Sequence, residues 1–324
     1  MLADQTPAGS GGDARRLAGA ATGPGSGPVA AAGGQEPAGP LPVDPIFQEE
    51  PSELNGLAVG RHSKPAFLDV NGDGRPDLIV GNAEGKLLHF ENLGPTQNPK
   101  WKLVTDAFAD FHQGRNSAPA FADADGDGDL DLLVGTEEGR VFLFENVGSA
   151  KQPRFVLRED ALRSVRTGKN AVPLMLGLEA NGPQLLVGSL RGGLQFFKRK
   201  PGSVFDYELN DRRFLGIDLG VNTSPAAADL TLVNRIDLLV GTDKGPIVVL
   251  VPTGTNPVRS SGWKTNPSHL AGLKMPLGSH PALVDLDGDG DLDLVVGSDR
   301  GPLVFFRNLA LSRDAPGPLG APPR

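Results

Sequence analysis

The sequence predicts an all-β protein, a five-bladed β-propeller of four-stranded blades. The first observation is a proline that recurs at intervals of 52 to 56 residues, a period typical of propeller blades or solenoid turns. The second is an aromatic residue 18 positions before each proline. The third is that each repeat contains four short apolar segments, the strand content of one blade. The prolines are Pro65, Pro119, Pro173, Pro225 and Pro281, and the aromatic residues are Phe47, Trp101, Phe155, Tyr207 and Trp263.

The order of the four segments predicts the order of the strands in a blade. The segment after the proline is small and apolar without alternation, as expected for an innermost strand that packs on both faces. The second segment ends in glycine, and a third apolar segment follows a short turn. The aromatic segment that opens the next repeat is expected to be the outermost strand. The glycines that end the second segment are Gly81, Gly135, Gly188, Gly241 and Gly297.

The segment around Phe47 precedes the first repeated proline and has no blade of its own in this arrangement. The fifth blade lacks an outermost strand, and this segment can supply it. We therefore expect the N-terminal strand to close the ring and leave no open edge between the first and last blades. A solenoid would not need such a strand, so the pattern favours the closed propeller.

Three repeats carry an acidic loop between the first and second strand, at residues 69–77, 123–131 and 285–293. Oxygen-bearing side chains at loop positions 1, 3, 5 and 9, with a backbone carbonyl at position 7, suit a hard cation such as Ca²⁺. A glycine at position 6 permits the tight arc. The opening matches an EF-hand loop, but no Glu stands at position 12 and no helical pattern flanks it, so an EF-hand is not expected. The predicted metal residues are Asp69, Asn71, Asp73, Arg75 and Asp77, then Asp123, Asp125, Asp127, Asp129 and Asp131, then Asp285, Asp287, Asp289, Asp291 and Asp293.

The formal net charge of -8 comes largely from these loops, which hold 13 of the 39 acidic residues. Three bound Ca²⁺ ions would offset most of that charge. No basic stripe is present, so a nucleic-acid partner is not expected. No run of about 18 apolar residues predicts a transmembrane segment, and no signal peptide is visible. The absence of cysteine excludes disulfides and thiolate chemistry.

The ends of the chain differ from the repeats in composition. Residues 1–43 are rich in Ala, Gly and Pro and contain no aromatic residue, so they cannot bury enough apolar surface to become ordered. We expect a disordered linker there, able to tether the propeller of residues 44–312, and a similar disordered tail at residues 313–324.

The acidic repeats resemble the FG-GAP/VCBS repeats of integrin α-chain heads and many bacterial secreted proteins. The segment Phe-Leu-Asp-Val-Asn-Gly-Asp-Gly-Arg-Pro-Asp-Leu-Ile-Val-Gly, ending at Gly81, and its two counterparts carry the resemblance. The resemblance implies a calcium-binding propeller whose relatives are secreted or adhesive proteins. The third repeat is one residue shorter in the loop, and the fourth places Thr231 and Val233 at positions 3 and 5. Those two blades are expected to keep their strands and lose the metal.

The opposite face of the ring is a second candidate site, because the loops that enter each innermost strand meet there. Basic residues and carboxamides recur in these loops, and they could bind an acidic or hydroxyl-rich partner. The alternative is that Asn and Ser cap the turns while the basic side chains are solvated. The candidate ligand residues are Arg61, His62, Arg115, Asn116, Lys169, Asn170 and Asn222.

The sequence favours a non-enzymatic module that binds a protein or a glycan, in an extracellular, cell-surface or periplasmic setting where Ca²⁺ is near millimolar. No catalytic residues are assigned. One alternative is a propeller-type polysaccharide lyase or hydratase, which would need a convergent cluster of His, Tyr and carboxylate groups in a pocket. Another is a structural accessory subunit of a larger surface assembly.

Overall fold

The computed structural model describes residues 43–177, 182–211, 214–216, 219–233, 235–253 and 262–311. The predicted linker at residues 1–43, apart from Val43, and the predicted tail at residues 313–324 lie outside this range. Among the described residues, no helix is both long and apolar enough to cross a lipid bilayer.

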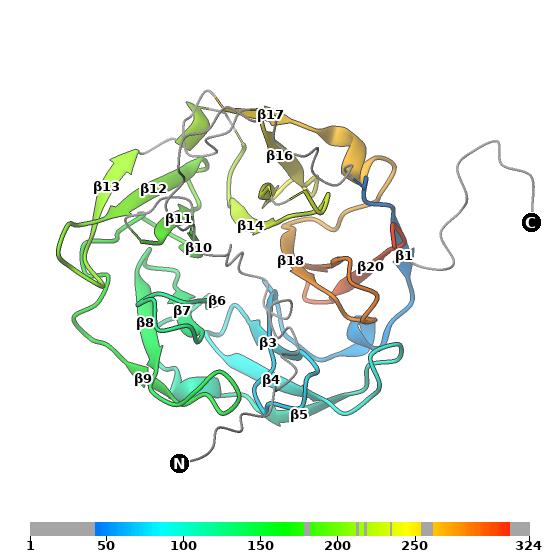
Figure 1. The fold of residues 1–324 in the computed structure, drawn as a ribbon, viewed down its shortest axis with the longest axis horizontal. Coiled ribbons are helices and arrows are strands. Elements are labelled where there is room, and N and C mark those ends of the chain that lie inside the picture. The colour runs from blue at the N-terminus through cyan, green and yellow to red at the C-terminus, as the bar shows by residue number, and fades with distance from the viewer. Residues whose placement is uncertain are drawn as a thin grey trace, which may run out of the picture.

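Five four-stranded antiparallel sheets form the fold, which confirms the predicted five-bladed propeller. Figure 1 shows the blades arranged around a central axis. The first blade is β2 (Lys64–Leu68), β3 (Asp77–Gly81), β4 (Leu87–Asn92) and β5 (Trp101–Thr105), and the second is β6 (Ala118–Ala122), β7 (Asp131–Gly135), β8 (Val141–Asn146) and β9 (Phe155–Leu157). The third is β10 (Val172–Leu176), β11 (Gln184–Gly188), β12 (Leu194–Arg199) and β13 (Tyr207–Asp211), and the fourth is β14 (Ser224–Ala228), β15 (Asp237–Gly241), β16 (Val248–Pro252) and β17 (Trp263–Thr265). The fifth is β18 (His280–Val284), β19 (Asp293–Gly297), β20 (Val304–Asn308) and β1 (Phe47–Glu50).

The N-terminal strand closes the ring as predicted. Strand β1 pairs with β20 in an antiparallel register that places Phe47 opposite Asn308 and Glu50 opposite Phe305. The side-chain oxygen of Asn308 also accepts a hydrogen bond from the backbone N–H of Ile46 at 2.9 Å. Figure 1 shows β1 beside β20, so the two ends of the described chain share one blade.

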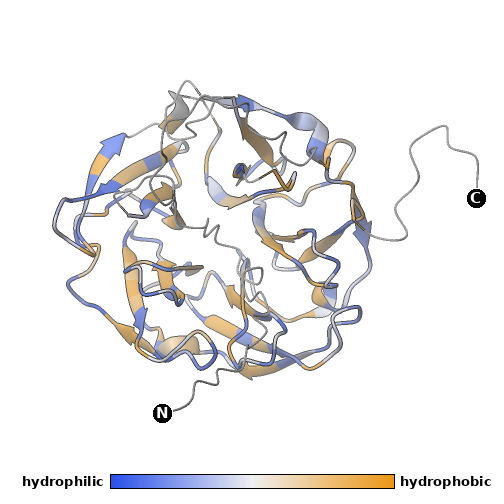
Figure 2. Ribbon diagram, in the orientation of Figure 1, coloured by the Kyte–Doolittle hydropathy of each residue, from blue (hydrophilic) through white to orange (hydrophobic). Residues whose placement is uncertain are grey.

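The apolar segments became strands because each blade buries both of its faces against its neighbours. Every residue of the second strand of each blade is buried, from β3 to β19. Figure 2 shows the apolar residues concentrated on the strands and the polar residues on the connecting loops. The outermost strands are less buried, and Lys102, Leu103 and Val104 of β5 face solvent.

The glycine that ends each second strand lies where adjacent blades approach closely. A Cβ atom on Gly135 would lie 2.0 Å from the backbone oxygen of Ala171, which leads into the next blade. The equivalent glycines in the other four blades have the same contact at 2.0 to 2.2 Å. The repeated glycine is therefore required by the spacing between blades.

Hydroxyl groups two positions before the repeated proline connect neighbouring blades. The oxygen of Ser117 accepts a hydrogen bond from the backbone N–H of Asn82 at 3.0 Å, and Ser63 accepts one from Ser298 at 2.9 Å. Thr223 and Ser279 accept equivalent bonds from Ser189 and Thr242. The third blade has Ala171 at this position.

Candidate functional site

The three acidic loops connect the first and second strands of the first, second and fifth blades, so they lie on one face of the ring. In the second blade, the carboxylate of Asp123 accepts hydrogen bonds from the backbone N–H groups of Gly126 at 2.7 Å and Gly128 at 3.2 Å. Gly126 and Gly128 have φ angles of 92° and 97°, a region that favours glycine. These bonds fold the loop into the tight arc that the spacing predicted.

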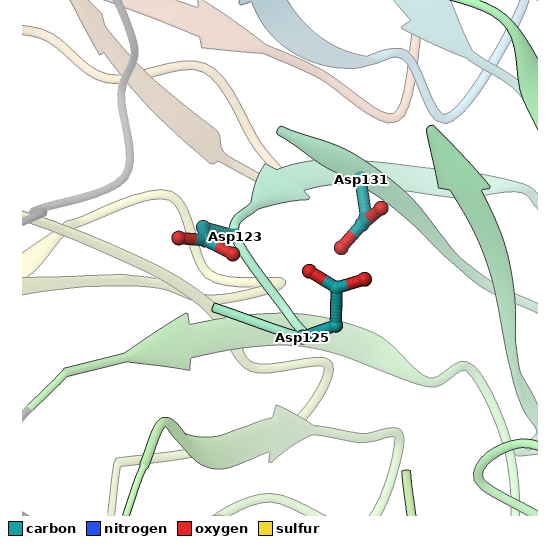
Figure 3. A group of neighbouring side chains, drawn as sticks. All are labelled: Asp123, Asp125 and Asp131. Atoms are coloured by element: carbon teal, nitrogen blue, oxygen red, sulfur yellow. The ribbon is translucent and has the colours of Figure 1, made fainter. Parts of the chain in front are cut away.

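The arc brings carboxylates together in two loops. Ligand atoms of Asp123, Asp125 and Asp131 lie within 4.8 Å of one another, and those of Asp285, Asp287 and Asp289 form a second group of the same size. Figure 3 shows the carboxylates of Asp125 and Asp131 turned toward each other, with Asp123 beside them. Each group could hold a metal ion.

Buried oxygen atoms without hydrogen-bond partners support a cation in both loops. In the described part of the chain these atoms include Oδ1 of Asp129, Oδ2 of Asp289 and Oδ1 of Asp291. Such orphaned acceptors are uncommon in folded proteins and require a compensating partner. All are carboxylate oxygens, the donor type that hard divalent cations prefer. The donor set therefore fits an oxygen-coordinated ion.

Crowding and burial change the pKa values of the carboxyl groups in these loops. Burial raises the pKa of Asp131 to about 7 and that of Asp293 to about 8. Burial, together with the neighbouring Asp127, raises the pKa of Asp129 to about 6. Without a cation, these groups therefore retain protons that carboxyl groups in water release.

The aspartate at loop position 9 also has a structural role. Asp131 accepts backbone hydrogen bonds from Ala124 at 2.9 Å and from Asn146 at 2.8 Å. Asp293 accepts the equivalent pair at 3.1 and 2.8 Å, and Asp77 the equivalent pair at 3.2 and 2.8 Å. This aspartate joins the acidic loop to the third strand of its blade. The asparagine that ends each of these third strands was not predicted from the sequence, although it recurs as Asn92, Asn146 and Asn308.

The first acidic loop differs from the other two because it contains its own cation. The guanidinium of Arg75 pairs with the carboxylate of Asp73 and donates to the backbone oxygen of Asn92 at 2.9 Å. Asn71 donates its amide to Glu91 at 3.1 Å. Within the described residues, this loop forms no carboxylate group like those of the second and fifth blades. A metal ion at residues 69–77 stays a prediction.

The loops of the third and fourth blades were expected to lack a metal. The third falls largely on residues 178–181, which lie outside the described residues. In the fourth, the carboxylate of Asp229 accepts hydrogen bonds from the backbone N–H groups of Thr231 and Val233, both at 3.2 Å. Asp237 is buried with its pKa raised to about 7 by burial, and its Oδ2 atom has no partner in the described part. Loop positions 3 and 5 offer no second carboxylate.

On the opposite face, one position in each entry loop has a left-handed backbone. His62, Asn116, Asn170 and Asn222 have φ angles of 51° to 53°, and Gly278 occupies the same position in the fifth blade with φ of 63°. Asn and Gly adopt this conformation more readily than other residues. The recurrence of Asn at this position therefore has a backbone cause. Replacing Asn116 with Ala would strain the loop, so that change is a poor probe of ligand binding.

The carboxamides also form a hydrogen-bonded chain across the mouth of the central tunnel. Asn116 Nδ2 donates to Asn170 Oδ1 at 3.0 Å, and Asn170 Nδ2 donates to Asn222 Oδ1 at 3.0 Å. The chain begins at Lys64, whose Nζ atom donates to Asn116 Oδ1 at 2.6 Å. The structure thus brings the three predicted asparagines together in one network, called the asparagine chain below.

The predicted basic residues lie farther out. Arg61, Arg115 and Lys169 are exposed, and their backbone oxygens accept hydrogen bonds from Ala83, Glu137 and Leu190 at 2.8 to 2.9 Å. Their side chains form no ion pair among the described residues and are solvated at the rim. His62 is half-buried, and its Nδ1 atom lies 3.3 Å from Asp299 Oδ1.

Two buried basic residues at the mouth were missed as site residues. Lys64 and His280 directly precede the repeated proline in adjacent blades, and both are 5 % exposed. Burial lowers the pKa of Lys64 to about 7. Burial, with Lys64 and His62 nearby, lowers the pKa of His280 well below its usual value. The same position holds Ala118, Val172 and Ser224 in the other blades. A basic residue at an aligned position that is otherwise small and mostly apolar was therefore the signal in the sequence that could have identified them.

The cluster at the mouth does not include the tyrosine that the enzyme alternative required. The chain has a single tyrosine, Tyr207, which is fully buried in an apolar core cluster. Its hydroxyl group donates to the backbone oxygen of Pro183 at 3.2 Å. The aromatic residue of the fourth repeat, which begins the outermost strand of the third blade, therefore has the structural role that its place in the repeat indicated.

The fold and the acidic loops together define a class, a propeller whose blades carry metal-type aspartate loops. A family model described as FG-GAP-like repeat matches residues 69–134, and one described as FG-GAP repeat matches residues 277–308. The chain therefore contains FG-GAP repeats, which confirms the resemblance seen in the sequence. The two matches contain the acidic loops of the first, second and fifth blades.

Two further comparisons complete the picture. No curated protein matches the chain. Solved structures do match, and one is a lectin of Agrocybe aegerita, described as specifically recognising non-reducing terminal N-acetylglucosamine. The identity is 21%, the TM-score is 0.42, and the match covers 78% of this chain and 67% of the lectin chain. A likeness of this size bears on neither ligand nor mechanism.

Proposed function

We propose that this FG-GAP propeller is a non-enzymatic binding module, stabilised by Ca²⁺, that holds a protein or glycan partner on the face opposite the acidic loops. The observation that carries the metal part is the pair of carboxylate groups with orphaned buried oxygens in the second and fifth blades. An extracellular, cell-surface or periplasmic setting fits, because weak oxygen-ligand sites need Ca²⁺ near millimolar.

The residues that would hold the ion are those that the arc brings together. In the second blade they are Asp123, Asp125 and Asp131, with Asp129 adding a buried oxygen. The ion would supply positive charge that offsets the repulsion among these carboxylates. The backbone N–H groups of the loop already hold Asp123 in place, so little reorganisation is needed on binding.

Removing Ca²⁺ is expected to lower the melting temperature. If each loop binds Ca²⁺ at one tenth of the free concentration, it contributes about 1.4 kcal/mol, so the two loops contribute about 3 kcal/mol and roughly 5 °C. Differential scanning calorimetry in 1 mM Ca²⁺ and after metal removal measures the difference. The double variant Asp125→Asn with Asp287→Asn should melt at the same temperature in both conditions.

The control is Glu208→Gln, which removes one carboxylate charge from an exposed position on β13. It should keep the full Ca²⁺ response. A wild-type protein that melts identically with and without Ca²⁺, and releases no heat in a Ca²⁺ titration, would contradict the proposal.

The size of the Ca²⁺ effect is expected to depend on pH. The pKa values of Asp131, about 7, and Asp293, about 8, lie above the unfolded value near 4. The metal-free folded state therefore holds more protons than the unfolded state, and its stability falls as the pH rises from about 4 to about 8. Ca²⁺ replaces these protons, so the gap between the two melting temperatures should widen from pH 5.5 to pH 8. A gap that is constant or narrows would show that these carboxyl groups do not hold the ion.

A further inference from the structure

Lys64 is a buried cation without a bonded carboxylate. Its ammonium group donates to Asn116 Oδ1 at 2.6 Å and to the backbone oxygen of His62 at 3.3 Å. Both acceptors are neutral, and the third proton of the ammonium group forms no hydrogen bond within the described residues. A lysine is rarely buried unless a negative charge compensates it. Asp299 lines the same pocket, but its bonded partner there is His62, at 3.3 Å.

His280 provides a second, independent sign of a missing ligand. Its side chain is buried, and its Nδ1 atom has no hydrogen-bond partner in the described structure. Lys64 and His280 begin the adjacent innermost strands β2 and β18 and line the same two cavities. A buried ring nitrogen without a partner is costly unless another group completes it.

The direction of the asparagine chain adds a third donor. Lys64 can only donate, so the Asn116 atom that faces it must be the oxygen. This choice fixes the amide orientation of Asn116, Asn170 and Asn222 in turn. The chain therefore ends on Nδ2 of Asn222, which donates to no acceptor in the described part of the chain. Donors exceed acceptors around this pocket, which favours a ligand rich in acceptors.

The space at the mouth limits the size of the ligand. The cavity between His62, Lys64, Asn222 and His280 has a volume of about 10 Å³. It adjoins a tunnel cavity of about 70 Å³ lined by the five repeated prolines and by small and aromatic side chains. One water needs roughly 10 to 15 Å³ by this measure, so the space suits a group of a few heavy atoms. Pockets for drug-sized ligands have volumes of about 300 to 1,000 Å³.

We infer that the tunnel mouth is a receptor for a single carboxylate group, with Lys64 and His280 as its principal donors and Asn222 as a third. The inference rests on the proposed binding function and names the group that the mouth recognises. The carboxylate belongs to a free short-chain acid, whose alkyl part enters the apolar tunnel, or to a Glu or Asp side chain of a partner protein. A carboxylate supplies the negative charge that Lys64 lacks and accepts hydrogen bonds from all three donors.

The test is a calorimetric titration of the full chain in 1 mM Ca²⁺ at pH 6.5 and constant ionic strength. Sodium propionate and a blocked tripeptide with a central Glu are the two carboxylate probes, which distinguish the two sources. Propionamide, the matching Gln tripeptide and sodium chloride are the controls. At least one carboxylate probe should bind at least tenfold more tightly than its amide counterpart. Equal binding of the carboxylate and its amide, or of chloride, would overturn the inference.

Two variants separate the site from the rim. Lys64→Met replaces the side chain as far as Cε, removes the ammonium group, and should reduce carboxylate affinity at least tenfold. Lys169→Met removes an exposed rim cation and should leave the affinity unchanged. Should Lys64→Met not fold, the pKa of Lys64 in the wild-type protein, followed by NMR, provides the same information. Saturating carboxylate should raise that pKa, and an unchanged pKa would contradict the inference.

The pH dependence gives a further readout. Between pH 6.5 and 8.5, Lys64 loses most of its proton, because burial lowers its pKa to about 7. Arg61, Asp299 and Glu137 are the other charged groups that act on this pocket. The pKa values of His62 and His280 are lowered, so both are mostly neutral over this range. Carboxylate affinity should therefore fall about tenfold or more from pH 6.5 to pH 8.5. If Ca²⁺ still stabilises the protein but no carboxylate binds, the inference fails and the calcium proposal stands. If a carboxylate binds but Ca²⁺ does not stabilise the protein, the calcium proposal fails and the inference stands.

Discussion

A chain that begins at residue 52 is expected to lose most of its cooperative folding, because it lacks the strand that closes the ring. Strand β1 forms four residue pairs with β20, and Glu50 forms an ion pair with Arg307 at 3.1 Å. The backbone hydrogen bonds of this ladder and the partial burial of Phe47 together contribute about 5 kcal/mol, a large share of a typical folding free energy. Without β1, strand β20 presents an unpaired edge that promotes aggregation. Circular dichroism melts and light scattering measure both effects.

The control is a chain that begins at residue 43 and keeps β1. It should melt at the temperature of the full chain. A peptide spanning residues 43–52, added to the shorter chain, should restore part of the lost stability. If the chain from residue 52 melts like the full chain, the closing strand does not hold the ring together.

The variant Gly135→Ala is expected to destabilise the propeller by about 3 kcal/mol, the upper part of the usual range for overpacking a core. The added methyl group would lie 2.0 Å from the oxygen of Ala171 and 2.8 Å from Cδ of Pro173. The backbone oxygen of Ala171 cannot turn away as a flexible side chain could, so the second and third blades must separate. Urea denaturation measures the loss.

Gly56→Ala is the matched control. No atom lies within 4 Å of a Cβ atom built on Gly56, so the same added methyl group has open space there. The stability should change by less than about 1 kcal/mol. Similar losses for the two variants would show that the contact between blades does not explain the repeated glycine.

The fold was predictable because a propeller places equivalent side chains in equivalent environments. Trp101, Phe155 and Tyr207 recur at one spacing because each begins the outermost strand of its blade. Phe47 has the same spacing, which identified the strand that closes the ring. The second-strand glycines recur because each faces the backbone of the next blade. A packing requirement that every blade shares therefore selects the same kind of residue at the same position of each repeat.

The tunnel mouth was only partly predictable, because its chemistry comes from residues that break the repeat. The three asparagines were found because they share an aligned position. Lys64 and His280 were not assigned to the site, since a basic residue before a proline has no special meaning until the blades meet around a tunnel. Only the closed ring shows that both side chains line one pocket.

The first acidic loop shows a second limit of the sequence. The spacing of Asp69, Asp73 and Asp77 matches the other loops, and the residue at position 7 was expected to contribute only its backbone oxygen. In the structure the side chain of Arg75 pairs with Asp73. The direction of a long side chain depends on its neighbours, here the end of strand β4, and spacing along the chain does not contain that information.

The pairing of β1 with β20 also determines how the propeller would respond to mechanical load. Phe47 lies opposite Asn308, so the chain enters and leaves the ring at the same end of this antiparallel pair. A force that pulls the two flanking segments apart would break the hydrogen bonds between β1 and β20 one after another. The two strands would therefore separate under a weak force, whereas a load applied through the opposite face would leave their pairing intact.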